Sequence, residues 1–189
     1  MAYTLFDRDG NEINLHDLQD KGFWYDRGVR KEEVFVDKYG DRLNLDINPK
    51  KQTNKAALDL INTQNNREGD LKTQNTPFFT AEKNYNINPQ YAVTFNNNDK
   101  ERYEKKYEDI DIYFAIDWQA VRIEFPNDSF DPIEVNPMEG IWRIRFLDLC
   151  KMVEKNYLHE YKQRKNDNRG NAKSSYVLDL NDNSFTRLI

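Results

Sequence analysis

The stretch that decides the fold is residues 58–74, LDLINTQNNREGDLKTQ. Apolar residues mark its two ends, and between them lies a run of Asn, Gln, Arg and Gly that is typical of a turn. We therefore predict a hairpin, with a short strand over 57–61, a connection over 62–69 and a returning strand over 70–75.

Alternation along this hairpin brings charged side chains to one face. Side chains at i, i+2 and i+4 of a strand share a face, so Asp70, Lys72 and Gln74 are predicted to project together while Leu71 points into the core. Asp59 lies between two leucines on the preceding strand and is also expected to face away from the core. Pairing of the two strands would then bring both carboxylates and the lysine together.

This combination of groups has a chemical use. Two carboxylates can hold Mg²⁺ or Mn²⁺ and still leave coordination positions for water and phosphate oxygens. The metal lowers the pKa of a bound water and neutralises charge on the phosphate. An ammonium beside it can orient that water or stabilise the transition state. The pattern therefore indicates metal-dependent hydrolysis of a phosphodiester bond.

The elements around the hairpin predict a mixed α/β domain. Glu32, Phe35, Val36 and Tyr39 have the spacing of one helix face, which predicts a helix over 28–40 that ends at Gly40, with a strand over 34–36 as the alternative. Further predicted elements are an N-terminal hairpin or extension over 1–22, strands over 43–47, 91–95, 110–118 and 120–125, a helix capped at 98–99 that runs to 107, a long helix over 138–165, and a terminal hairpin formed by 176–180 and 185–189. The order helix, three strands, helix, strand predicts a mixed central sheet in one domain over 1–189, with its core at about 28–125 and a C-terminal helix and hairpin over 138–189.

Asp59, Asp70 and Lys72 resemble the motif of the PD-(D/E)xK nuclease superfamily, in which an acidic residue on one strand precedes (D/E)-x-K on the next. The likeness covers about residues 28–118, and Leu58 stands where the family name has proline. It implies a restriction-endonuclease-like fold, a mixed central β-sheet flanked by helices. It also implies a Mg²⁺- or Mn²⁺-dependent deoxyribonuclease, acting as an endo- or exonuclease, with Asp59 and Asp70 as metal ligands and Lys72 as a catalytic residue.

Two more positions match the family. Many members carry a glutamate on the first helix that faces the site, and Glu32 is the matching candidate for a catalytic residue and metal ligand, with Glu33 as an alternative. Gln74 resembles the glutamine that follows the lysine in some exonuclease-like branches, and it would support the site.

Other interpretations of the same residues stay open. The two acids and the lysine could form a solvent-exposed ion pair that contributes little to stability. The chain could also be an inactive nuclease fold that serves as a binding or interaction module, or a structural protein of a mobile element with an accidental motif. Asp109 and Asp111 share a face and could bind metal, although a solvent-facing strand end is favoured.

The net charge and the positions of the basic residues limit which binding partners are expected. The net charge of -5 disfavours a passive nucleic-acid binder, so a DNA partner would need a local basic patch. The first candidates for phosphate contacts are the basic residues Lys162, Arg164, Lys165, Arg169 and Lys173, and the second are Lys50, Lys51 and Lys55. Phe78 and Phe79 could line a substrate groove or pack in the core.

The remaining composition points to a soluble, intracellular protein. Cys150 is the only cysteine, which excludes an internal disulfide and cysteine clusters for zinc, and the two histidines, His16 and His159, are far apart in the sequence. The sequence shows neither a membrane-spanning run nor an apolar N-terminal leader. We therefore expect a soluble cytoplasmic protein with no membrane partner, and a homodimer is left open.

Overall fold

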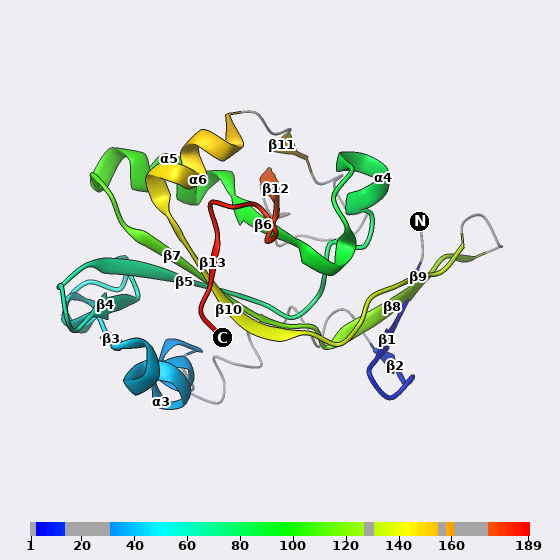
Figure 1. Ribbon diagram of the computed structural model, residues 1–189, viewed down its shortest axis with the longest axis horizontal. Coiled ribbons are helices and arrows are strands. Elements are labelled where there is room, and N and C mark those ends of the chain that lie inside the picture. Colours follow the sequence, from blue (N-terminus) through cyan, green and yellow to red (C-terminus); the bar gives the residue numbers. More distant parts are fainter. Residues whose placement is uncertain (1–2, 14–30, 127–130, 155–157, 161–173) are drawn as a thin grey trace.

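The computed structural model describes residues 3–13, 31–126, 131–154, 158–160 and 174–189. Within these ranges the chain is a mixture of helices and strands, and the strands form three sheets. A six-stranded sheet lies at the centre, and helices lie on both of its faces (Figure 1). The prediction of a mixed central sheet flanked by helices is confirmed at this level.

The central sheet has the strand order β13-β10-β7-β5-β4-β3. Its strands are β3 (Leu45–Ile47), β4 (Leu60–Asn62), β5 (Glu68–Gln74), β7 (Asp111–Asp117), β10 (Glu139–Arg145) and β13 (Thr186–Arg187). β5 and β7 run parallel, and the other neighbouring pairs are antiparallel. The predicted hairpin is present, with Leu60 of β4 opposite Gly69 of β5, but its first strand covers 60–62 rather than 57–61, so Asp59 precedes the strand.

Helix α3 (Lys31–Leu43) covers one face of the central sheet, the lower face in Figure 1. Its Phe35 is buried and packs in a cluster with Leu45, Leu60 and Tyr113. The predicted helix is confirmed over its described part, and the alternative of a strand over 34–36 is wrong. The predicted helical positions before Lys31 lie outside the described residues.

The C-terminal end of α3 differs from the prediction. The helix does not end at Gly40 but continues to Leu43, and Asn44 follows with a left-handed φ of 54°. Gly40 has a packing role instead, because a Cβ at this position would lie 2.7 Å from the carbonyl oxygen of Leu45. Glycine therefore lets α3 approach β3 closely.

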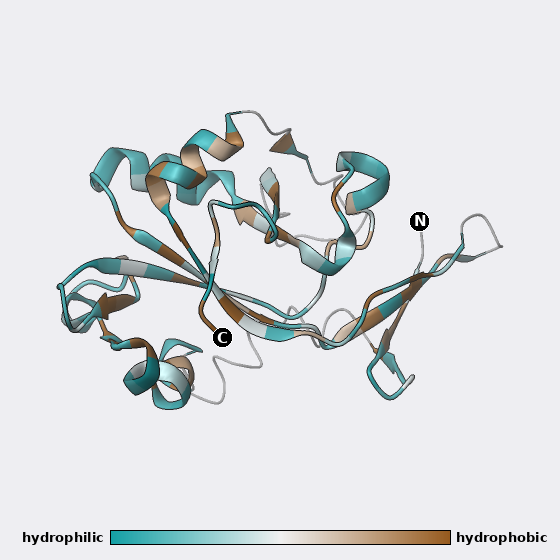
Figure 2. Ribbon diagram, in the orientation of Figure 1, coloured by the Kyte–Doolittle hydropathy of each residue, from teal (hydrophilic) through white to brown (hydrophobic). Residues whose placement is uncertain are grey.

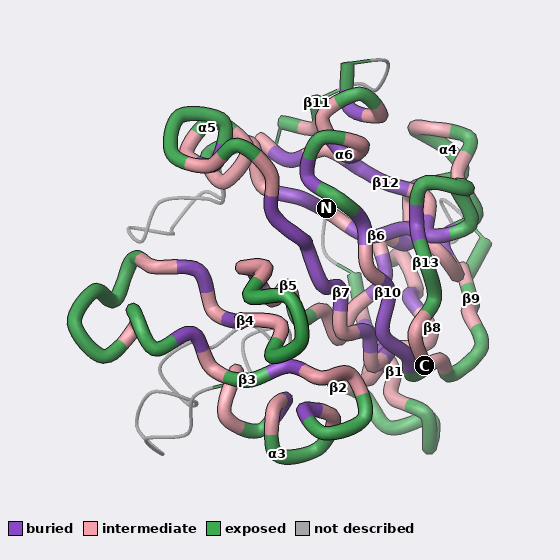
Figure 3. The backbone as a smooth tube through the Cα atoms, turned by 60° about the vertical axis from the view of Figure 1, so that its left-hand side comes forward, coloured by how far each residue is buried: buried purple, intermediate pink, exposed green. Residues whose placement is uncertain are grey.

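The other face of the central sheet is covered by two helices and a small sheet (Figure 1). These elements are α5 (Asn97–Lys106), α6 (Phe146–Val153), β6 (Ala92–Asn96), β11 (Leu158–His159) and β12 (Ser175–Asp179), with the sheet order β11-β12-β6. The main hydrophobic core fills the space between these layers, where Ile112 and Phe114 of β7 meet Phe95, Tyr103 and Leu149. Figure 2 shows the outer turns of α5 as hydrophilic, and Figure 3 shows the buried residues along β7.

A third sheet extends to one side of this body, with the order β2-β1-β8-β9 (Figure 1). Its strands are β1 (Thr4–Asp7), β2 (Glu12–Ile13), β8 (Ala120–Glu124) and β9 (Ile133–Glu134). The predicted N-terminal hairpin is present as β1 and β2, and Gly10 in its turn has a φ of 82° that glycine adopts readily. Three short helices connect elements elsewhere: η1 (Pro49–Gln52), α4 (Ala81–Tyr85) and η2 (Pro89–Tyr91).

Two predictions for the C-terminal part are wrong. The expected helix over 138–165 is instead strand β10 followed by the short helix α6. In β10, Trp142 and Ile144 pack in the main core, while the other face combines the buried Ile141 with Glu139, Arg143 and Arg145, so the alternation of a strand is present. The expected terminal hairpin is also wrong, because β12 pairs with β6 and β13 pairs with β10.

Candidate active site

β5 presents Asp70 and Lys72 to the face of the central sheet that α5 covers. The side chain of Asp70 is 7% exposed, and its Oδ2 lies 2.7 Å from the Nζ of Lys72. Leu71, between them, packs with the cluster on the α3 side. The two charged side chains therefore share a face, as the alternation along the strand predicts.

Asp59 lies beside them, at the bend that precedes β4. Its Oδ2 accepts a hydrogen bond of 3.1 Å from the backbone N–H of Leu71, so the carboxylate is held against β5 next to Asp70. Burial raises the pKa of Asp59, and the charge of Asp70 raises it further, against the lowering effect of Lys51. The hairpin has thus brought the first and second acids of the motif into one electrostatic unit.

Glu32 of α3 is connected to Asp59 by Lys51, which forms an ion pair with each of them. The Nζ of Lys51 lies 2.9 Å from Oε1 of Glu32 and also forms an ion pair with Oδ1 of Asp59. Burial would lower the pKa of Lys51, but its hydrogen bonds to Asp59 and Glu32 outweigh that effect and raise it. The sequence offered Lys51 only as a phosphate contact, because nothing in a polar loop shows which acids it will bridge.

Two residues of α5 join the site on its other side. The Nζ of Lys72 lies 2.6 Å from Oδ2 of Asp99 and 3.3 Å from the hydroxyl of Tyr103. The sequence predicts a helix cap at 98–99, but the cap is Asn96, whose side chain accepts from the N–H of Asn98, and Asp99 contacts the site instead. The sequence does contain a pattern that indicates this position of Asp99. Asp99 and Tyr103 are four positions apart and so lie on one helix face.

The electrostatics of Lys72 keep it protonated. Burial would lower the pKa of Lys72, but the charges of Asp70 and Asp99 outweigh that effect and raise it. Its ammonium also lies 5.5 Å from the ring centroid of Tyr103 and 5.8 Å from that of Phe95, within the range of cation–π attraction. Burial, together with the charges of Asp70 and Asp99, raises the pKa of Tyr103. Lys72 is therefore a fixed positive charge rather than a base.

Gln74 has a different environment from the other predicted residues. Its Nε2 donates to the carbonyl of Thr94 at 2.7 Å, and its Oε1 accepts from the N–H of Thr94 at 3.1 Å. The side chain thus joins β5 to the backbone of β6. Gln74 therefore connects two strands next to the site and is not part of the charged cluster.

The donor set can be tested against a metal ion. Asp70 Oδ2 is buried and forms an ion pair with the ammonium of Lys72. No group of three or more His, Cys, Asp and Glu side chains among the described residues is arranged to hold a metal. Mg²⁺ is nevertheless commonly held by one or two carboxylates with water and substrate phosphate as the other ligands. Asp59 and Asp70 fit that mode of binding.

Asp109 and Asp111 form a separate cluster with arginines. Arg67 Nε lies 3.1 Å from Oδ1 of Asp111, and both Arg67 and Arg145 form ion pairs with Oδ2 of Asp109. Burial would raise the pKa of Asp109, but these guanidinium groups outweigh it and lower the pKa. These two acids are compensated by arginine, rather than exposed at a strand end as the sequence favoured.

The other predicted contact residues have these positions. The basic positions between 162 and 173 lie outside the described residues, as does His16. Lys50 is paired with Glu68 at 3.0 Å. Phe79 is buried in a core cluster with Leu5, and Phe78 packs against another buried cluster, so both serve the core.

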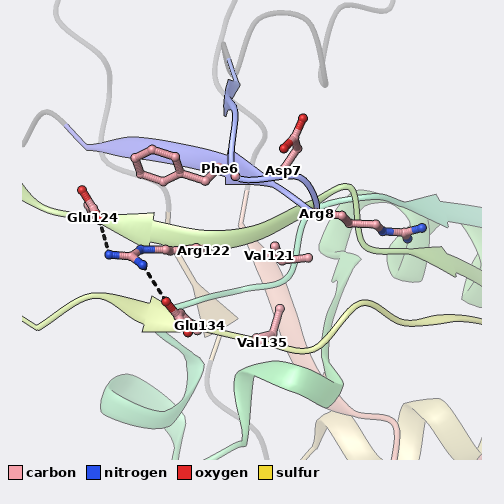
Figure 4. Close-up of a pocket in the computed structure, with 9 residues that line it drawn as sticks. Phe6, Asp7, Arg8, Val121, Arg122, Glu124, Glu134 and Val135 are labelled. Atoms are coloured by element: carbon pink, nitrogen blue, oxygen red, sulfur yellow. Dashed lines mark hydrogen bonds and ion pairs between the residues drawn. The ribbon is translucent and has the colours of Figure 1, made fainter.

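A hollow of about 370 Å³ lies on the third sheet, between β1, β8 and β9 (Figure 4). Phe6, Arg122 and Glu134 are among its lining residues, and Arg122 forms ion pairs there with Glu124 and Glu134. None of the lining residues belongs to the cluster around Asp70. The hollow is thus separate from the candidate active site.

Comparison with known proteins gave no match: no family model, no curated protein and no solved structure matches the chain. Within the described ranges, none of the helices has the length and apolar character needed to cross a membrane. The functional argument therefore rests on the residues and geometry given above.

Proposed function

We propose that this protein is a Mg²⁺-dependent nuclease that hydrolyses phosphodiester bonds of DNA, with a restriction-endonuclease-like fold of the PD-(D/E)xK type. The observation that carries the proposal is that Asp59 lies beside Asp70 and Lys72. Asp59 accepts from the N–H of Leu71, the residue between them on β5, and Asp70 forms an ion pair with Lys72. The surrounding order of elements supports it: helix α3, strands β3 to β5, helix α5, and then β7 parallel to β5.

Each residue has a role that follows from its geometry. Asp59 and Asp70 would hold the metal, which when bound supplies an acidified water and neutralises phosphate charge. Lys72, held protonated by Asp70 and Asp99, would donate to the attacking water or to a phosphate oxygen. The water oxygen bonds to phosphorus as one ester P–O bond breaks, which leaves a phosphate monoester and an alcohol.

The proposal is tested by incubating linear and circular DNA with the protein and Mg²⁺. Lys72→Met should lower the cleavage rate by roughly a hundredfold or more, because removing a charge-stabilising donor costs that much in comparable sites. Lys38→Met is the control, since Lys38 is also paired with a carboxylate, but that carboxylate is Glu139 of β10. Equal cleavage by the wild type and the Lys72 variant would remove Lys72 from the mechanism.

A second candidate is a nuclease-like fold used for binding without catalysis. The observation that favours it is that both oxygens of Asp59 already have partners, Lys51 and the N–H of Leu71. Calorimetry with Mn²⁺ separates the two candidates. A binding module should show no divalent-metal affinity that depends on Asp59 and Asp70.

A further inference from the structure

Lys51 contributes a cation to the site that the motif itself does not include. Its ammonium lies between Glu32 of α3 and Asp59 at the start of β4, and its side chain is only 13% exposed. The backbone around it is fixed. The side chain of Asn48 caps η1, and the N–H of Asn48 donates to the carbonyl of Asp59 at 2.9 Å.

The position of Lys51 is that of a bridging cation. Glu32 and Asp59 are both largely buried, at 18% and 20% side-chain exposure, so leaving their charges without a counter-charge would be costly. One ammonium contacts an oxygen of each. A divalent ion shared by two carboxylates would occupy the same kind of place.

Asp70 lies on the other side of Asp59. It is 5% exposed as a residue, and its Oδ2 forms an ion pair with the ammonium of Lys72 at 2.7 Å. The ion expected from the proposed function would therefore lie toward Asp70, while the Glu32 side of Asp59 is taken by Lys51. In sites with two metal ions the ions lie about 3.5–4 Å apart and share such a carboxylate.

We propose that Lys51 is a positioning residue that supplies the second positive charge of the site. The chain then binds one divalent ion, through Asp59 and Asp70, and the Lys51 ammonium takes the place of another between Glu32 and Asp59. This inference rests on the proposed function only for the ion at Asp70. The role of Lys51 itself follows from the contacts of its ammonium.

The test counts bound Mn²⁺ per chain by electron paramagnetic resonance on folded, full-length protein. Wild type should bind one ion. Lys51→Met should bind one more, because an ammonium then no longer occupies the place between Glu32 and Asp59. Lys51→Arg keeps the charge and should keep the wild-type count. Glu32→Gln combined with Lys51→Met should lose the additional ion.

Lys51→Gln, which retains hydrogen-bonding capacity, replaces Lys51→Met if the latter does not fold. An unchanged count of one in the Lys51 variants overturns the inference and leaves the proposed function standing. A wild-type count of two overturns it as well. Zero ions in the wild type and one in Lys51→Met would uphold the role of Lys51 and remove the metal-dependent function. Zero ions in both would overturn both.

Discussion

Two clusters of charged side chains lie at the same end of the central sheet, and their most buried carboxylates, Asp70 and Asp111, point to opposite faces. In the register of β5 and β7, Asp70 is opposite Ile112 and Gly69 is opposite Asp111, so the side chains of Asp70 and Asp111 point to different faces. The site cluster consists of Glu32, Asp59, Asp70, Asp99, Lys51, Lys72 and Arg102. The arginine cluster consists of Asp109, Asp111, Arg67, Arg143 and Arg145.

The two clusters differ in how well their charge is compensated. Counting only the ion pairs among the described residues, the site cluster has four carboxylates and three cations, whereas the arginine cluster has two carboxylates and three cations. The pKa values follow this balance. Burial and the charge of Asp70 raise the pKa of Asp59, while guanidinium groups overcome burial and lower the pKa of Asp109. Because the site cluster has more carboxylates than cations, it can accept a metal ion. The arginine cluster has more cations than carboxylates, and we infer that it stabilises the fold.

The largest expected effect is on stability in the presence of metal. At a Mg²⁺ concentration of about 100 times its dissociation constant, the free energy of unfolding should rise by about 2.7 kcal/mol, because the ion binds the folded chain alone. Asp59→Asn should lose this increase and Asp109→Asn should keep it. Urea denaturation with and without Mg²⁺ measures this rise in unfolding free energy. An equal rise in both variants would contradict the claim that only the site cluster binds metal.

The next effect is on stability without metal. Asp109→Asn removes charged acceptors from Arg67 and Arg145, and we expect a loss of about 2 kcal/mol, within the range for hydrogen bonds to charged groups. Arg145 is 54% exposed, so solvent screening limits the expected loss of unfolding free energy. Urea denaturation at pH 7 is the measurement. A loss below about 0.5 kcal/mol would show that the arginine cluster is not structural.

The arginine cluster also predicts an acid dependence. The pKa of Asp109 in the folded chain lies below its ordinary value of 3.8. Its contribution to stability is therefore complete above the unfolded pKa and is lost as the pH falls through the folded pKa. The difference in unfolding free energy between wild type and Asp109→Asn should be constant from pH 7 to about pH 5 and shrink below about pH 4. A difference that grows toward low pH would contradict this assignment.

The smallest effect concerns Gln74. Gln74→Leu removes two hydrogen bonds to the backbone of Thr94, each worth about 1 kcal/mol net. Stability should fall by about 2 kcal/mol or less, since Leu recovers some apolar contact, and metal affinity should stay within about twofold. Thermal denaturation and Mn²⁺ calorimetry measure these quantities. A large loss of metal affinity would place Gln74 in the site itself.

The hairpin and its charged face could be predicted because they depend on local signals. Turn residues separate two short apolar runs, and period-two alternation sets Asp70 and Lys72 on one side whatever lies elsewhere in the chain. The first helix was likewise predicted from its 3.6-residue period, but its end was not. The close approach to Leu45 that requires Gly40 is a tertiary contact.

The errors arise where burial comes from distant segments. β10 becomes a strand through its pairing with β7 and β13, which come from distant parts of the chain, although residues 139–145 do alternate between polar and apolar side chains. Lys51 and Asp99 were not assigned to the site because their partners come from other elements. A sequence pattern reports the periodicity of one segment, and it does not report which segments pack together.

The most direct test of the central claim, that Asp59 and Asp70 act as one metal site for DNA hydrolysis, is a double-mutant measurement of the cleavage rate in Mg²⁺. Asp59→Asn and Asp70→Asn should each lower the rate by roughly a hundredfold or more, and the double variant should be no slower than the slower single variant, because residues that act as a unit are not additive. Asp109→Asn is the matched control. Wild-type rates in the Asp70 variant, or losses that simply multiply in the double variant, would contradict the account.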